Sequence, residues 1–161
     1  MLGLGMGLGR VRRLLEVVPP EPVNLIAPGT FDSGTESWQG ARGAETIAND
    51  NGALLVTATG TTNYGASVAL TGLTVGAVYD VLMDITLSTG QSAFVRVSTN
   101  SLLTTGNIAL QTVTGTAKVT VSKSFTATAA IMYFGTVNGG NVAGSTTRID
   151  NVSVVPQDPL A

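Results

Sequence analysis

Carboxylates are the only side chains in this 161-residue chain that could act as general acids or bases near neutral pH, because the sequence contains no histidine and no cysteine. Asp80 and Asp84 lie four residues apart on one face of an expected strand, which separates them by about 13 Å. Glycosidase acid pairs lie closer together, at about 5–10 Å. We therefore interpret both residues as solvated side chains of a polar face and expect no catalytic residue and no enzyme.

Asp32 and Glu36 form a second candidate acid pair, in a segment rich in glycine, serine and threonine. Their expected place in a loop favours turn capping over catalysis. No glycine-rich phosphate loop stands between a strand and a helix, so nucleotide binding has no support in the sequence. Without cysteine there is also no disulfide framework and no zinc site of the cysteine kind.

Charge and hydropathy limit the partners further. The formal net charge is −2, which gives no general attraction to nucleic acid. The longest apolar runs, such as residues 127–135, are far shorter than the roughly 20 residues of a membrane-spanning helix. The first arginines follow an apolar run instead of preceding it, so we expect no secretion signal of the usual form. We expect neither a nucleic-acid partner nor a membrane partner.

The pattern beyond the first two dozen residues is one of strands and turns in a single domain. Tyr79, Val81, Met83 and Ile85 alternate with mostly polar residues, which predicts a half-buried strand over residues 79–88. About eight or nine short strands separated by glycine-containing turns suit a β-sandwich. The other expected strand runs are residues 53–59, 67–70, 93–98, 108–113, 118–125, 130–137 and 148–154.

The last of these runs changes its phase once. Ile149 and Val152 are three residues apart, whereas Val152 and Val154 are two apart. An inward-facing strand keeps a period of two, so one extra residue must be accommodated. We predict a β-bulge at Asp150 and Asn151.

Two motifs bracket this domain. The stretch NLIAPGTFDSGTESW, residues 24–38, resembles the opening strand and first loop of carbohydrate-binding modules of families 4, 9 and 22. RIDNVSV, residues 148–154, resembles their last strand, and GLTVGAVYDV, residues 72–81, is similar to an internal run of the same modules. The resemblance implies an all-β fold, a jelly-roll β-sandwich of antiparallel strands, over residues 24–161.

The same resemblance implies a structural calcium ion between the first loop and the last strand. The matching residues here are Asp32 and Asp150, and carboxylates together with loop carbonyls are the hard oxygen ligands that calcium takes. The alternative is that Asp32 caps a turn and Asp150 accepts a hydrogen bond from a backbone amide. No cofactor is otherwise required.

Sugar-binding modules use aromatic side chains that stack on sugar rings, and aromatic residues make up only 5% of this chain. Trp38 lies in the motif where such folds use it for packing, and Phe31, Tyr79 and Phe125 follow core-like patterns. Tyr64, in the stretch TTNYG, is the one aromatic residue that we expect in a position to contact a glycan. The alternative for Tyr64 is packing on the edge of the domain.

Residues 1–23 differ in composition from the rest and are predicted to form an anchoring arm with a proline-rich linker. The stretch LGLGMGLG, residues 2–9, puts its apolar side chains on one face if extended. Residues 10–18 fit two turns of amphipathic helix, which ends at Pro19. The expected partner-binding residues are Leu2, Leu4, Met6, Leu8, Arg10, Val11, Arg12, Arg13, Leu14, Leu15 and Val18.

A glycine- and leucine-rich start followed by arginines resembles the openings of small bacteriophage structural proteins. The resemblance implies a non-enzymatic virion protein for capsid decoration, a head fibre or the tail, assembled in the host cytoplasm. The arm would bind other virion proteins, and the sandwich would project outward in a symmetric homo-oligomer such as a trimer. The alternative is a secreted or cell-surface carbohydrate-binding module that adheres to polysaccharide; weak glycan binding fits either interpretation.

Overall fold

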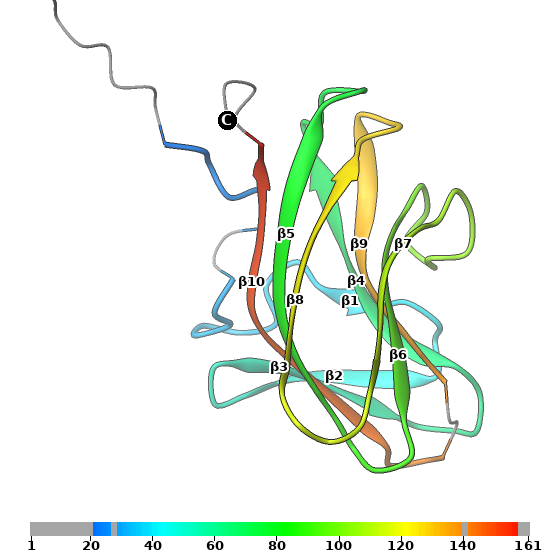
Figure 1. Ribbon diagram of the computed structural model, residues 1–161. Helices are drawn as coiled ribbons and strands as arrows, with labels where there is room; N and C mark the ends of the chain where they lie inside the picture. The colour runs from blue at the N-terminus through cyan, green and yellow to red at the C-terminus, as the bar shows by residue number, and fades with distance from the viewer. Residues whose placement is uncertain (1–20, 27–28, 140–141, 158–161) are drawn as a thin grey trace, which may run out of the picture.

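The computed structural model describes residues 21–26, 29–139 and 142–157, which form ten strands in two packed sheets (Figure 1). In this part of the chain no helix is long and apolar enough to cross a membrane. The helix expected at residues 10–18 and the apolar stretch before it lie outside the described residues. The strands are β1 (Gln39–Gly40), β2 (Glu45–Asp50), β3 (Ala53–Ala58), β4 (Tyr64–Thr71), β5 (Val78–Leu87), β6 (Ser92–Ser98), β7 (Ile108–Thr114), β8 (Val119–Thr126), β9 (Ile131–Gly139) and β10 (Thr146–Pro156).

Sheet A has the strand order β1-β4-β9-β6-β7, and sheet B has the order β2-β3-β10-β5-β8. All paired strands are antiparallel. The chain crosses between the sheets repeatedly, for example from β3 to β4 and from β9 to β10, so each sheet contains strands that are far apart in sequence. The predicted jelly-roll β-sandwich is confirmed. Strands β3 to β10 each overlap a run expected from the sequence, whereas β1 and β2 were not expected.

The core lies between the sheets and is filled mainly by alternate residues of the longer strands. Tyr79, Val81, Met83 and Ile85 of β5 are each at most 4% exposed, which confirms the predicted dry face. Trp38 lies in this core, within the contiguous cluster that both sheets build. Burial of these side chains is the main stabilising contribution to a sandwich of this size.

The N-terminal segment lies beside β10, so the two ends of the domain are in contact (Figure 1). The amide of Leu25 donates to the carbonyl oxygen of Val154 at 2.8 Å. The amide of Val154 donates to Oδ1 of Asn24, also at 2.8 Å. The amide of Val152 also donates to the carbonyl oxygen of Gly29 at 3.0 Å, but no strand is assigned to residues 21–26 or 29–38. The prediction of an opening strand is therefore wrong, although the segment lies alongside β10 and is hydrogen-bonded to it.

A register shift interrupts the pairing of β10 with β5. Asp150 pairs with Asp84, but the next pair is Ser153 with Leu82. Asn151 lies within the shift and has a φ of 50°, in the left-handed region that asparagine tolerates better than most residues. A β-bulge is present as predicted, but its unmatched residues are Asn151 and Val152, because Asp150 is still paired.

Candidate functional site

An aromatic ring is exposed on the outer face of sheet A. Strand β6 places Ala93, Val95 and Val97 in the core, each at most 1% exposed, and directs Phe94 and Arg96 outward. Phe94 is 40% exposed, and the Cζ atom of Arg96 lies 5.6 Å from the centroid of its ring. This face therefore carries an apolar ring beside a fork of hydrogen-bond donors.

The cross-strand neighbours of Arg96 are small, namely Gly135 of β9 and Ala109 of β7. Phe94 lies opposite the apolar Val137 of β9 and the polar Thr112 of β7. Short side chains on both sides leave the long arginine side chain room to extend over the sheet. We call Phe94, Arg96 and Thr112 together the Phe94 platform.

The segment between β6 and β7 folds back over the other half of this face. Leu103 is fully buried against Ala41 and Val137. Ser67 of β4 donates through Oγ to the carbonyl oxygen of Ser101 at 2.8 Å. The face is thus covered near β1 and β4 and open over β6 and β7.

Polar side chains fix the shape of this covering segment. Asn100 accepts the amide of Thr104 through Oδ1 at 2.9 Å and donates through Nδ2 to the Thr104 hydroxyl at 2.7 Å. Ser98 donates through Oγ to the carbonyl oxygen of Thr105 at 2.6 Å. A segment held by its own hydrogen bonds needs little further ordering when a ligand binds beside it.

The arginine of the platform is electrostatically constrained. Burial lowers the pKa of the Arg96 guanidinium, and the positive charge of Arg42 lowers it further. The group still carries its charge at neutral pH, because an arginine pKa starts far above 7. A ligand that binds beside Arg96 therefore meets two positive charges, those of Arg96 and Arg42.

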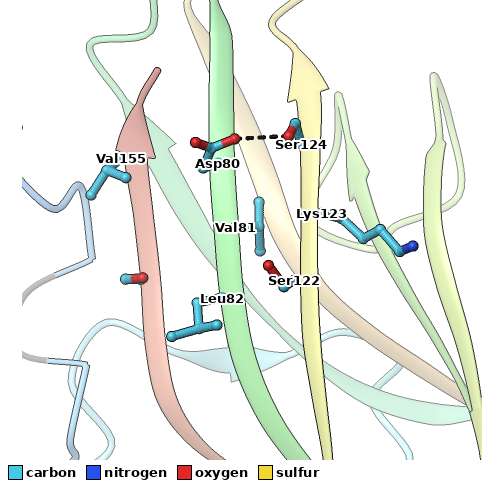
Figure 2. A pocket seen from close by; sticks show the side chains of 8 residues that line it. Asp80, Val81, Leu82, Ser122, Lys123, Ser124 and Val155 are labelled. Atoms are coloured by element: carbon cyan, nitrogen blue, oxygen red, sulfur yellow. Dashed lines mark hydrogen bonds between the residues drawn. The ribbon is translucent and has the colours of Figure 1, made fainter. Parts of the chain in front are cut away.

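The outer face of sheet B has a shallow groove of about 350 Å³ (Figure 2). Ser124 donates to Oδ1 of Asp80 at 2.7 Å across the groove, and Gln157 donates to the same oxygen at 3.4 Å. None of the described residues that line the groove is aromatic, so they offer no stacking surface for a sugar. The outward side chains that line it belong to Asp80, Leu82, Ser122, Ser124, Ser153 and Val155.

The second acid of this face is not solvated as the sequence suggested. Asp84 is 7% exposed because neighbouring strands cover it. Thr120 donates to its Oδ1 at 2.6 Å, and Lys118 and Asn151 donate to its Oδ2 at 3.0 and 2.8 Å. The pKa of this carboxyl is lowered, mainly by the Thr120 hydrogen bond; burial opposes the shift, and the Asn151 and Lys118 contacts add to it. The carboxylate is a cross-strand connector whose hydrogen bonds are already taken.

The prediction that Tyr64 is an exposed glycan contact is wrong. Strand β4 begins at this residue, three positions before the expected start, and Tyr64 points inward with Ala66 and Val68. Its side chain is fully buried, and its hydroxyl lies 3.5 Å from Oε1 of Gln91 and 3.3 Å from Oγ1 of Thr147. Burial raises the pKa of its phenol. Tyr64 is a core residue with a satisfied hydroxyl.

The two residues implied for calcium each have a local partner. Asp32 accepts the Thr30 hydroxyl at 2.7 Å, and Asp150 accepts the backbone amide of Asn151 at 2.8 Å. Glu36 accepts the hydroxyl of Ser33 at 3.0 Å, as expected of a turn cap. In residues 21–26, 29–139 and 142–157, no three acidic, histidine or cysteine side chains are close enough to hold a metal ion together. A calcium ion at Asp32 and Asp150 stays a prediction.

The residues expected to bind a partner, Leu2 to Val18, lie outside the described part of the chain. The exposed ring of Phe94 was not anticipated from the sequence. Its signal is the run Ala93 to Val97, in which small apolar residues alternate with phenylalanine and arginine. The small apolar residues of such a run share one face of the strand, and a face of that composition is expected to be the buried one.

No protein-family model matches the sequence, and no curated protein sequence matches it. Solved structures do match the fold. One is described as "CBM4 structure and function", with a TM-score of 0.65 and 17% identity over 80% of this chain and 97% of that one. Another is the CBM22-1 xylan-binding domain of Paenibacillus barcinonensis Xyn10C, with a TM-score of 0.62 and 14% identity over 84% of this chain and 95% of that one.

A third match is the enzymatically active domain of tailspike protein 4 from bacteriophage CBA120. Its TM-score is 0.59 and its identity is 11%, over 83% of this chain and 21% of the tailspike chain. At identities this low the likeness concerns the fold. The chain has the jelly-roll fold of carbohydrate-binding modules.

Proposed function

We propose that this domain is a non-catalytic carbohydrate-binding module that holds a polysaccharide on the Phe94 platform. The observation that carries the proposal is the exposed ring of Phe94 beside the Arg96 guanidinium, 5.6 Å from ring centroid to Cζ. The fold supports it, because two of the matching structures are carbohydrate-binding modules, one of them described as xylan-binding. The engaged carboxylates of Asp80 and Asp84 support the absence of catalysis.

The platform has the two kinds of contact that a sugar ring needs. The C–H face of a pyranose packs on an aromatic ring, and its hydroxyls pair with polar side chains. Phe94 supplies the apolar surface, and Arg96 and Thr112 supply donors beside it. The open strands β6 and β7 offer a long surface, which suits a chain of sugars better than a single one.

Replacing Phe94 with alanine is expected to weaken polysaccharide binding about 10- to 100-fold, because the contact area of one aromatic side chain is lost. Affinity electrophoresis in gels that contain soluble polysaccharides, followed by calorimetry on the best ligand, measures the change. Leu82→Ala is the matched control, since Leu82 is also 40% exposed but lies on sheet B. Equal loss in both variants, or unchanged binding by Phe94→Ala, would remove the platform from the site.

A second candidate function is attachment to a virion, as the sequence predicted. The match to a bacteriophage tailspike domain supports it, and so does the apolar arm at residues 1–18. In this candidate the arm binds other virion proteins, the sandwich faces outward, and the protein forms a symmetric oligomer. Glycan binding by the platform is compatible with such a place, because a virion protein can adhere to the surface of its host.

Deleting residues 1–18 is expected to leave a folded domain that no longer joins its particle or oligomer. Burial of four leucine-sized side chains of the arm contributes about 6–12 kcal/mol before ordering costs, enough for docking when several arms bind together. Co-sedimentation with particles that lack the protein, and mass in solution, measure the loss. Full assembly by the truncated protein would show that the arm has no anchoring role.

A further inference from the structure

A second arginine, Arg42, meets Arg96 of the Phe94 platform. Arg42 follows β1 at one edge of the sheet, whereas Arg96 lies in β6, beyond β4 and β9. Both donate to the carbonyl oxygen of Leu103, Arg42 through Nη2 at 3.5 Å and Arg96 through Nη1 at 3.3 Å. Because one oxygen accepts from both guanidinium groups, the two positive charges lie side by side.

Neither guanidinium forms an ion pair among the described residues, although the Glu45 carboxylate accepts the backbone amide of Arg42 at 3.0 Å. In the part of the chain that the structure describes, the ion pairs involve Lys118 and Arg148 instead. Nε of Arg42 is buried and has no hydrogen-bond partner among the same residues. A guanidinium has five N–H donors, and the shared contact with the Leu103 carbonyl uses one from each arginine. The buried Nε of Arg42 is out of a ligand's reach, so what the pair keeps for an anionic ligand is its charge and its remaining Nη donors.

The charged residues of the two sheets are segregated. The strands of sheet A contain no aspartate or glutamate, and Arg96 is their one charged residue. The chain has a net charge of −2, and the Glu45 carboxylate accepts the backbone amide of Arg42 at 3.0 Å, so the positive charge that an anion can meet here is that of the two guanidinium groups themselves. The strands of sheet B contain five acids, namely Glu45, Asp50, Asp80, Asp84 and Asp150.

We propose that Arg42 and Arg96 select acidic polysaccharides, that is, glycans with carboxylate or sulfate groups, at the Phe94 platform. The proposal rests on the proposed carbohydrate-binding function and names its substrate class. A guanidinium fork holds a planar carboxylate, or two oxygens of a sulfate, through parallel charge-assisted hydrogen bonds. The ring of Phe94 contacts the sugar while the adjacent arginines contact its acidic group.

A glycan fits this site better than a nucleic acid does. Affinity for nucleic acid grows with the number of phosphates that basic side chains neutralise, and only two arginines gather here. The arginines also hold the covering segment through Leu103. A purely structural role of the arginines would affect stability but would not make the protein prefer acidic over neutral sugars. The preference for acidic sugars is therefore the measurement that separates a binding role from a structural one.

The test compares polysaccharides that share a backbone and differ in charge. Polygalacturonate of low and of high methyl esterification varies the carboxylate, and cellulose sulfate and hydroxyethyl cellulose vary the sulfate. Affinity is measured by calorimetry at about 0.15 M salt, where long-range attraction is screened. The wild-type protein is expected to bind at least one acidic form about tenfold more tightly than its neutral counterpart, and Arg96→Gln is expected to abolish this preference.

Lys123→Gln is the matched control, because it removes one positive charge from β8 of sheet B. It is expected to keep the preference. Equal weakening by Arg96→Gln and Lys123→Gln would show general charge attraction and overturn the proposal. Tighter binding of a single-stranded oligonucleotide than of any acidic glycan would also overturn it, in favour of nucleic acid.

The two proposals fail in different ways. Equal binding of acidic and neutral forms, with loss in Phe94→Ala, would overturn the arginine inference and leave the carbohydrate-binding function standing. Absence of binding to every polysaccharide would overturn both. If Arg96→Gln does not fold, as judged by its melting curve, Arg96→Lys decides, because it keeps the charge and loses the fork. A severalfold drop in preference supports the proposal, and an unchanged preference in Arg96→Lys overturns it.

Discussion

Replacing Trp38 with alanine is expected to lower the free energy of unfolding by about 3–5 kcal/mol, the usual cost of truncating a buried aromatic residue to alanine. Trp38 is 5% exposed and contacts two other rings edge to face. Its ring centroid lies 6.0 Å from that of Phe31 and 6.2 Å from that of Phe134. The change leaves a cavity between the first loop and β9, and the close packing around it limits how far the neighbours can move to fill it. Urea denaturation followed by circular dichroism measures it.

Trp38→Phe is the informative comparison for this prediction. It keeps an aromatic ring between Phe31 and Phe134 and removes an indole N–H that is buried without a partner among the described residues. A cost of about 1–2 kcal/mol is therefore expected, well below that of alanine. Val75→Ala, at a side chain that is 62% exposed, should change stability by about 0.5 kcal/mol or less. If all three variants unfolded at the same urea concentration, Trp38 would not be the centre of this cluster.

The sequence predicted the core well wherever strict alternation decides which face is buried. The inward residues of β5 and the bulge in β10 follow from spacing alone, since one extra residue must reverse the phase of a strand. The motif that contains Phe31 and Trp38 predicted packing for both, and both are buried. In these places the spacing of apolar residues along the strand is enough to decide which side chains are buried.

Strand β2, which was not predicted, has a local turn signal, but its weak hydrophobic alternation hides it. Strand β2 pairs with β3 through a tight turn at Asn51 and Gly52, whose φ angles are 50° and 78°. An Asn-Gly pair between two extended runs is a strong hairpin indication. Exposed residues such as Thr46 and Ala48 dilute the hydrophobic alternation of β2, because it is an edge strand with little to bury.

The aromatic residues of the candidate site could not be assigned from the sequence. Tyr64 and Phe94 both lie in alternating runs, but one belongs to the buried set of its strand and the other to the outward set. Tyr64 belongs to the buried set because β4 begins at this residue, and the pairing of β4 with β9 determines where β4 begins. The meeting of Arg42 with Arg96 depends on Leu103, which is 7 residues from Arg96 but 61 from Arg42, and no local pattern contains the second separation.

Replacing Asp84 with asparagine is expected to destabilise the domain by about 1.5–3 kcal/mol at pH 7, since hydrogen bonds to a buried charged group are lost. Most of this cost is assigned to the Thr120 and Asn151 bonds, because the Lys118 side chain is 65% exposed and solvent screens its charge. Asp80→Asn is the control on the same strand and face, where partners are fewer and a change of about 0.5 kcal/mol or less is expected.

Acid should remove the difference between wild type and Asp84→Asn. The folded-state pKa of Asp84 lies below its ordinary value of 3.8, so the folded protein binds this proton more weakly than the unfolded chain does. The stabilisation is therefore complete above about pH 5 and is lost as the pH falls below about 4 and through the folded-state pKa. Urea midpoints at pH 7, 5, 4 and 3 should converge for the two proteins only in the most acidic samples. A gap that stays constant down to pH 3 would mean that the carboxylate charge does not connect β5, β8 and β10.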